Sequence, residues 1–270
     1  KIDDNRFYFT LNIPDKHKIA LISNSNVTTY YLKETLNALN KFGESLTVNE
    51  YLDLQDNNLN IFQQDVVIIF NPIILQSVTD SNIEEYLYNG GHIILIPNIN
   101  SESSAFSYID NITPHIAKSY TNLNQHTLSN GTFQEINLNS IQLQDIQKLF
   151  VNNNGPDRNI RFFKHIPLPF HPQYTQMQLN DGSSIWNRYE IQTGILDVFG
   201  YALNLDWTNF PIKGSFLPFY HTLLYSHNSD NDKLYMSAGD KWRHTVSDYY
   251  MNTVYHIQPD NSKTIIINDE

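Results

Sequence analysis

Asp65-Val-Val-Ile-Ile-Phe70 and His92-Ile-Ile-Leu-Ile-Pro97 are the two segments that decide the fold of this chain. Both are continuous apolar runs, which are typical of strands buried on both faces of a sheet. A polar, Glu-rich segment through Tyr88 separates them. Asn89-Gly90-Gly91 then follows as a helix C-cap, because glycine accepts the positive φ that such a cap needs. This order predicts a strand, a helix near 80–88 and a second, parallel strand.

The sequence before residue 65 repeats this pattern. A short apolar strand is expected at Lys18-Ile-Ala-Leu-Ile-Ser23 and an amphipathic helix from about Thr28 to Phe42, which Gly43 terminates. A further strand is expected at Ser45–Val48. Fully apolar strands that alternate with amphipathic helices predict an α/β fold with a mostly parallel sheet covered on both faces.

The later part of the chain is expected to extend this sheet with antiparallel strands. Strand-like segments lie at Gln176–Leu179, Ser184–Glu190 and Gly194–Ala202. Asp181-Gly182 predicts a hairpin between the first two of them. A helix is expected at about 215–227.

Length and composition suit one large domain with a smaller appendage. The chain has 270 residues, of which 40% are hydrophobic, so it carries enough apolar material for a core. We expect an α/β domain over residues 1–230, with a β-rich insertion at about 112–140, and a small β-rich C-terminal segment over 231–270. The chain begins without Met and ends in a strand-like run, so we expect a fragment of a longer protein.

The charge of the chain argues against nucleic acid as a partner. Lys and Arg number 17 against 28 Asp and Glu, which gives a formal net charge of -11, and no basic cluster occurs. Nucleic acid binding requires clustered basic side chains. The longest apolar runs, about six or seven residues, fall far short of the roughly 20 that span a bilayer. Any membrane segment is therefore expected outside these residues.

Two late segments resemble a known family. They read Ala202-Leu-Asn-Leu-Asp-Trp-Thr-Asn-Phe-Pro211 and Gly214-Ser-Phe-Leu-Pro-Phe-Tyr-His-Thr-Leu-Leu224. Together with the earlier strands, they resemble the extracytoplasmic part of BatA-type membrane proteins of Bacteroidota, named for an N-terminal aerotolerance-regulator region. Where that family usually has Ser and Val, this chain has Thr208 and Leu217. The resemblance extends over residues 6–225.

The resemblance implies both a fold and a location. The fold is that of class I glutamine amidotransferases, a three-layer relative of the flavodoxin-like sheets. The resemblance implies membrane segments on both sides of the domain. Because the loop between the first two spans is basic in relatives, it also implies a periplasmic location, as part of an inner-membrane protein. A cytoplasmic location is the alternative. The expected partners are proteins of the cell envelope, and the oligomeric state stays open.

The resemblance also raises the question of catalysis. Amidotransferases of this fold place a cysteine nucleophile at the elbow after a strand. The corresponding elbow here is Asn98–Ser101, and the chain contains no cysteine. A serine nucleophile at Ser101 or nearby would need small flanking residues and an adjacent His base, and Asn100 and Glu102 are not such flanks. We therefore expect a non-catalytic domain.

The chain lacks the sequence patterns of metal and cofactor sites. Its ten histidines are dispersed. His221 and His227 are six residues apart, whereas two ligands on one helix face are four apart. Neither a G-x-G-x-x-G motif nor a P-loop occurs. We therefore expect neither a metal nor a cofactor.

Asparagines follow several of the expected strands. Because the carboxyl ends of parallel strands meet at one edge of a sheet, we expect these polar side chains to converge there. They are Asn24, Asn26, Asn71, Asn98, Asn100 and Ser101. One interpretation of this edge is a polar, uncharged pocket for a sugar, a peptide or an amide group.

Asp206 and Trp207 allow two interpretations. In the first, they line a groove or contact a partner, with Trp207 as an aromatic anchor. In the second, which we favour, Asp206 is a turn residue and Trp207 packs over the sheet. The leading hypothesis is a non-catalytic interaction or scaffold domain of a membrane-anchored envelope protein. The alternative is a small-molecule binding module, or a degenerate hydrolase, that uses the polar strand ends.

Overall fold

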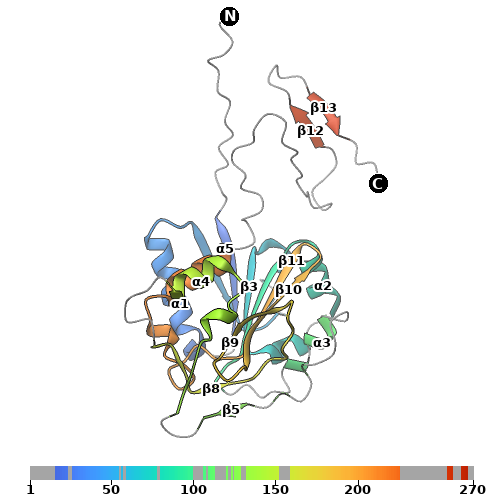
Figure 1. Ribbon diagram of the computed structural model, residues 1–270. Coiled ribbons are helices and arrows are strands. Elements are labelled where there is room, and N and C mark those ends of the chain that lie inside the picture. The colour runs from blue at the N-terminus through green and yellow to red at the C-terminus, as the bar shows by residue number, and fades with distance from the viewer. Residues whose placement is uncertain are drawn as a thin grey trace, which may run out of the picture.

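A seven-stranded sheet forms the centre of the structure, in the order β2-β1-β3-β4-β11-β10-β9 (Figure 1). Six of these strands run in the same direction, and β10 runs opposite to them. The strands are β1 (His17–Ile22), β2 (Leu46–Tyr51), β3 (Val66–Phe70), β4 (His92–Ile96), β9 (Thr175–Gln178), β10 (Ser184–Ile191) and β11 (Gly194–Phe199). The computed structural model describes residues 16–23, 26–54, 56, 59–77, 80–99, 106–107, 109–112, 120, 123, 125–128, 132–151, 159–225, 254–257 and 263–266.

Helices cover both faces of the sheet (Figure 1). One face carries α1 (Asn26–Lys41), α4 (Gln144–Val151) and α5 (Phe216–Tyr225), and the other carries α2 (Asp80–Tyr88) and α3 (Ile109–Ile112). This arrangement confirms the predicted three-layer α/β fold class with an antiparallel extension. Among the described residues, no helix combines the length and the apolar character that crossing a bilayer requires.

The first β-α units match the sequence pattern closely. Every residue of β3 and β4 is buried, as their continuous apolar runs predict. The helix predicted over 28–42 begins at Asn26 and ends at Lys41. Phe42, the last residue of the predicted amphipathic helix, is instead 81% exposed. It has left the helix, because the chain turns at Gly43 with a φ of +103° to enter β2.

The hairpin predicted at Asp181-Gly182 joins β9 and β10. The outer edge of β9 is covered by residues 137–142. The Asn137 amide donates to Gln178 O at 2.9 Å, and the Gln142 amide donates to Gln176 O at 3.2 Å. The Gln178 amide in turn donates to Ser140 Oγ at 2.8 Å. This edge of the sheet is therefore hydrogen-bonded by a loop and a short 3-10 helix, η5 (Leu138–Ser140).

The remaining described strands form short pairs. Within the insertion expected at 112–140, β5 (His126–Thr127) pairs with β8 (Lys164–His165), and β6 (Gln134–Glu135) pairs with β7 (Arg161–Phe162). Within residues 231–270 the structure describes a separate antiparallel pair, β12 (Val254–Ile257) and β13 (Lys263–Ile266).

Gly194 allows the end of α2 to lie close against the start of β11. A Cβ on Gly194 would collide with the backbone oxygen of Leu87 and would lie 2.6 Å from that of Gly91. We expect Gly194→Ala to lower the free energy of unfolding by about 3 kcal/mol, as overpacking against fixed atoms does. Gly182→Ala is the control, because its Cβ meets open space at a φ of +85° and should cost only about 1 kcal/mol. Urea denaturation measures both, and equal losses would contradict the close-approach explanation.

Candidate functional site

The carboxyl ends of β1, β3 and β4 lie side by side at one edge of the sheet. Ile22 of β1 is in register with Ile69 of β3, and Phe70 of β3 is in register with Ile96 of β4. Asn71 and Asn98, which follow β3 and β4, therefore occupy neighbouring strand ends, as the sequence predicts. Asn26 is the first residue of α1. Three further residues predicted for this edge lie outside the described residues: Asn24, Asn100 and Ser101.

Asn71 has an unusual backbone conformation. Its φ is +85°, which asparagine tolerates better than other residues with a side chain, at a cost of about 1 kcal/mol. Its amide donates to Ile96 O at 2.8 Å, and its Oδ1 accepts from the Ile73 amide at 3.3 Å. Strained positions of this kind are common at binding and catalytic sites. These two hydrogen bonds support the backbone conformation of Asn71 at the end of β3.

The described segments at the ends of β1, β3 and β4 carry no formal charge, and the charged pair beside them is Glu50 of β2, in register with Leu21, with Lys33 of α1. The described residues 19–23, 66–77 and 93–99 contain no Lys, Arg, Asp or Glu. Ile73 and Ile99 are 42% and 38% exposed, so apolar side chains lie next to the asparagines in sequence. An asparagine side chain offers two N–H donors and an acceptor oxygen, which suits an uncharged hydrogen-bonding ligand. We define Asn71, Ile73, Asn98 and Ile99 as the carboxyl-edge site.

A second polar cluster lies buried on β10, centred on Asn187. Asn187 Nδ2 donates to Pro169 O at 2.9 Å, and its Oδ1 accepts from Ser184 Oγ at 2.9 Å. The other partners of Asn187 are the hydroxyl groups of Tyr120, Tyr189 and Thr175. Burial raises the pKa of both tyrosines above the ordinary value of 10.0, so both hydroxyls stay protonated. The cluster joins the loop around Pro169 and residue 120 to the sheet.

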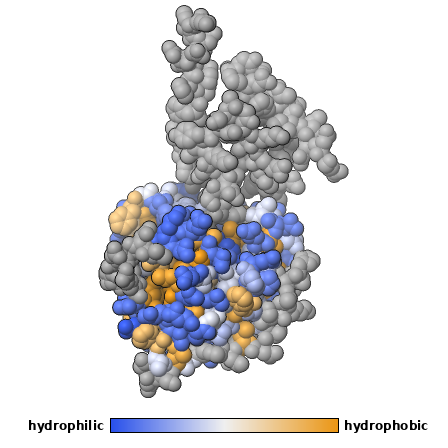
Figure 2. Space-filling model, viewed as in Figure 1, coloured by the Kyte–Doolittle hydropathy of each residue, from blue (hydrophilic) through white to orange (hydrophobic). Residues whose placement is uncertain are grey.

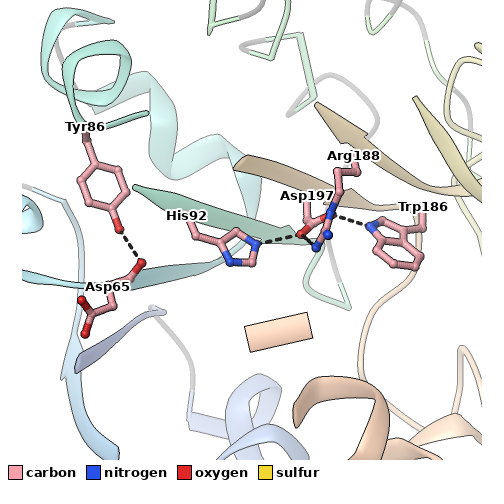
Figure 3. A network of polar contacts seen from close by, with 6 residues as sticks. All are labelled: Asp65, Tyr86, His92, Trp186, Arg188 and Asp197. Carbon is pink, nitrogen blue, oxygen red and sulfur yellow. Dashed lines mark hydrogen bonds and ion pairs between the residues drawn. The ribbon is translucent and has the colours of Figure 1, made fainter. Parts of the chain in front are cut away.

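A third cluster is charged and lies inside the sheet, around Asp197 of β11 (Figure 3). Arg188 of β10 donates to both carboxylate oxygens, from Nε at 2.8 Å and from Nη2 at 2.7 Å. Trp186 Nε1 donates at 2.7 Å, and His92 Nε2 of β4 lies 2.8 Å from Oδ2. Asp197 and His92 are 0% exposed and Arg188 is 7% exposed.

The environment of Asp197 keeps its carboxyl group ionised. Burial alone would raise the pKa, but the Arg188 guanidinium and the hydrogen bond from His92 outweigh burial and hold the pKa of Asp197 well below its ordinary value of 3.8. The pair of His92 and Asp197 has the composition of a catalytic dyad. However, both side chains are sealed from solvent, and His92 begins β4, at the opposite end of that strand from the carboxyl-edge site. The cluster therefore serves the core.

Sequence reasoning missed both buried clusters, because each joins residues that are far apart in the chain. His92 and Asp197 are separated by 105 residues, and Tyr120 and Tyr189 by 69. One signal was present. Arg188 and Asp197 each interrupt an otherwise strand-like segment. Two opposite charges in neighbouring central strands are typical of a buried ion pair.

The structure agrees with the packing interpretation of Asp206 and Trp207. Trp207 is 1% exposed, and its carbonyl accepts from the Phe163 amide at 2.7 Å. Asp206 is exposed, and its amide donates to Asn204 Oδ1 at 2.7 Å within a turn. Trp207 thus offers no surface to a partner. His221, considered as a metal ligand, lies 3.0 Å from Glu44 Oε1. Within the described part of the chain, no three acidic or histidine side chains gather as a metal site.

Comparisons with known proteins add information on the fold. No protein-family model and no curated protein matches this sequence. Two solved structures, cytoplasmic proteins STM3548 and STM1381 of Salmonella typhimurium, superpose with TM-scores of 0.55 and 0.56 at 13% identity, over 77% of this chain and 98% of theirs. A ThuA-like protein of Parabacteroides merdae gives a TM-score of 0.45 at 10% identity, over 80% of this chain and 91% of its own. At such identities the two Salmonella proteins establish a shared α/β fold, and nothing about activity.

Proposed function

We propose that this chain is a non-catalytic binding domain that holds an uncharged ligand at the carboxyl-edge site. The observation that carries this proposal is the set of asparagine-bearing strand ends, where β1, β3 and β4 end side by side and their described segments 19–23, 66–77 and 93–99 carry no charged residue. In open parallel sheets, ligands bind outside the carboxyl ends of the strands. A site of this kind at that edge can recognise a molecule rich in amide or hydroxyl groups, such as a sugar or a peptide.

The lack of charged residues in the described ends of β1, β3 and β4 narrows the class of ligand. Phosphate and carboxylate groups are bound by Arg or Lys, which form short, charge-assisted hydrogen bonds with them. The described strand ends of β1, β3 and β4 offer no such cation. The described residues that follow β3 and β4 offer amide side chains and the exposed Ile73 and Ile99. This combination of amide and apolar groups favours a neutral ligand over an anionic one.

The proposal of a non-catalytic role is supported by the chemistry of the available side chains. The chain has no cysteine, so the thiolate of an amidotransferase is missing. The acid–base pair of His92 and Asp197 is buried in the core and is occupied by Arg188 and Trp186. Neither group is available to a substrate at the carboxyl-edge site.

The setting that we propose is the periplasmic part of a membrane-anchored cell-envelope protein, with an envelope protein as partner. The resemblance of residues 202–224 to the BatA-type family supports this setting. In the structure these residues supply core side chains, among them Trp207, Phe210 and Phe219. In this chain, the residues that carry the resemblance therefore pack in the core and do not form a binding surface. A peptide segment of a partner is one neutral ligand that the carboxyl-edge site would suit.

Asn71→Gly and Asn98→Ala test the proposal. Glycine keeps the positive φ of position 71 and removes the side-chain amide, together with the hydrogen bond that its Oδ1 accepts from the Ile73 amide. With neutral oligosaccharides and dipeptide amides as probes in a thermal-shift screen, we expect a stabilising probe to lose about tenfold in affinity in each variant, as the loss of one or two hydrogen bonds predicts.

Gln192→Gly is the matched control, because Gln192 is an exposed residue with a φ of +55° in the turn between β10 and β11, at the other end of the sheet. We expect it to bind the probe as the unmodified chain does. A probe that binds equally well to all three variants would exclude the carboxyl-edge site. A preference for anionic probes would contradict the neutral class of ligand.

A further inference from the structure

The first strand and the last helix of the α/β domain meet at the amino edge of the sheet. His17 is the first residue of β1, and Tyr225 is the last residue of α5. Their rings stack with centroids 5.0 Å apart and planes at 30°. On α5 itself, the His221 ring lies 4.9 Å from the Tyr225 ring. An aromatic stack therefore joins the two ends of the domain.

Two carboxylates flank this stack. Glu44, in the turn between α1 and β2, lies 3.0 Å from His221 Nε2. Asp65, which directly precedes β3, lies 3.6 Å from His17 Nδ1, and the Lys18 amide donates to the same carboxylate oxygen at 2.7 Å. The fields of Glu44 and Asp65 both reach His17. We define His17, Glu44, Asp65, His221 and Tyr225 as the amino-edge clasp.

One nitrogen of the His17 ring is poorly placed to carry a proton in this arrangement. Its Nε2 is buried and has no hydrogen-bond partner among the described residues. The neutral ring, with its proton on Nδ1 toward Asp65, fits this environment. The imidazolium ring would place a second N–H where no acceptor is supplied, and an unsatisfied buried donor is costly. A charged His17 is therefore better accommodated once its ring has left Tyr225.

We propose that the amino-edge clasp is a pH-dependent latch, in which protonation of His17 releases the end of α5 from the start of β1. The direction of the pKa shift of His17 agrees with this geometry. Burial lowers the pKa of His17 below its ordinary value of 6.5, although the carboxylates of Asp65 and Glu44 act in the opposite direction.

The sign and the window of the effect follow from proton linkage. Because the pKa of His17 is lower in the folded state, the unfolded or released state takes up the proton first as pH falls. The latch is complete above pH 6.5 and weakens as pH falls through 6.5 toward the folded pKa of His17. The pKa of Glu44 is lowered by its hydrogen bond with His221, so the contribution of Glu44 is lost only as pH falls below 4.5. The two effects occur in separate pH ranges.

Histidine NMR titration and amide hydrogen exchange on the full chain test the latch. We expect the His17 ring to titrate below pH 6.5. We expect the amides of the last turn of α5 to lose protection between pH 6.5 and 5, by up to about tenfold per pH unit after correction for intrinsic exchange, the limit for one coupled proton. The amides of β4 should keep their protection over the same range.

Two variants identify the responsible ring. His17→Phe keeps a ring to stack on Tyr225 but cannot take a proton, so the pH response at α5 should vanish. His221→Gln removes the second imidazole of the clasp and keeps a donor toward Glu44, so the response should remain. A His17 titration at or above pH 6.5 would overturn the proposal, and so would an unchanged pH response in His17→Phe. Should His17→Phe fail to fold, the titration of the unmodified chain decides alone.

Discussion

We expect Asp197→Ala to lower the free energy of unfolding by about 3–5 kcal/mol, or to prevent folding altogether. The reason lies with Arg188 rather than with the lost carboxylate. Arg188 is 7% exposed and directs Nε and Nη2 at Asp197, so the substitution leaves a guanidinium charge inside the sheet without a counter-ion. The indole N–H of Trp186 loses its acceptor at the same time.

Urea denaturation of the single and double variants separates these causes. The double variant Asp197→Leu with Arg188→Met removes both charges and fills the space with apolar atoms, so it should be more stable than Asp197→Ala. A double variant as unstable as the single one would contradict the account based on an uncompensated charge. Because the folded pKa of Asp197 is lowered, its contribution is present above pH 3.8 and is lost as pH falls toward that lowered value.

We expect Trp207→Ala to lower the free energy of unfolding by about 3–5 kcal/mol, because it deletes one of the largest fully buried side chains. The cavity would open beneath the turn whose carbonyl accepts from Phe163 and Lys164. Asp206→Ala is the adjacent control. Its side chain is exposed, so the free energy of unfolding should change by no more than about 0.5 kcal/mol. Differential scanning calorimetry of both variants measures the contrast.

This result determines how a partner experiment on Trp207 can be interpreted. Loss of a partner in Trp207→Ala would report unfolding rather than loss of a contact. Trp207→Phe, which retains most of the buried ring, should keep both stability and binding. A Trp207→Ala variant that stays fully stable yet loses a partner would restore the anchor interpretation and contradict the packing interpretation.

The fold could be predicted where the sequence pattern is local. β3 and β4 are buried on both faces, so their runs of apolar residues are unbroken, and Asn89-Gly90-Gly91 marks the end of α2 with a φ of +91° at Gly90. The prediction that the helix includes Phe42 was wrong, because α1 ends at Lys41 and Phe42 already belongs to the turn before Gly43. Helical periodicity alone does not locate the last residue of a helix.

The candidate site could be predicted only in its position. Parallel strands bring their carboxyl ends together whatever their order, so Asn71 and Asn98 could be placed at one edge before the structure was known. The positive φ of Asn71 could not be predicted, because the Asn-Pro pair also occurs in ordinary turns. The clusters around Asp197 and Asn187 depend on which strands become neighbours, and that information is not local to any segment.

The loop over β9 has a consequence for association between copies of this domain. A sheet grows by accepting a strand at an exposed margin, and residues 137–142 already occupy the backbone groups of that margin. Within the described part of the seven-stranded sheet, the β2 side is the margin left for edge-to-edge contact. Copies that join through a single side can close into a two-fold pair, but they cannot continue into a filament. Association through the margins of the seven-stranded sheet therefore favours a pair of copies over a filament.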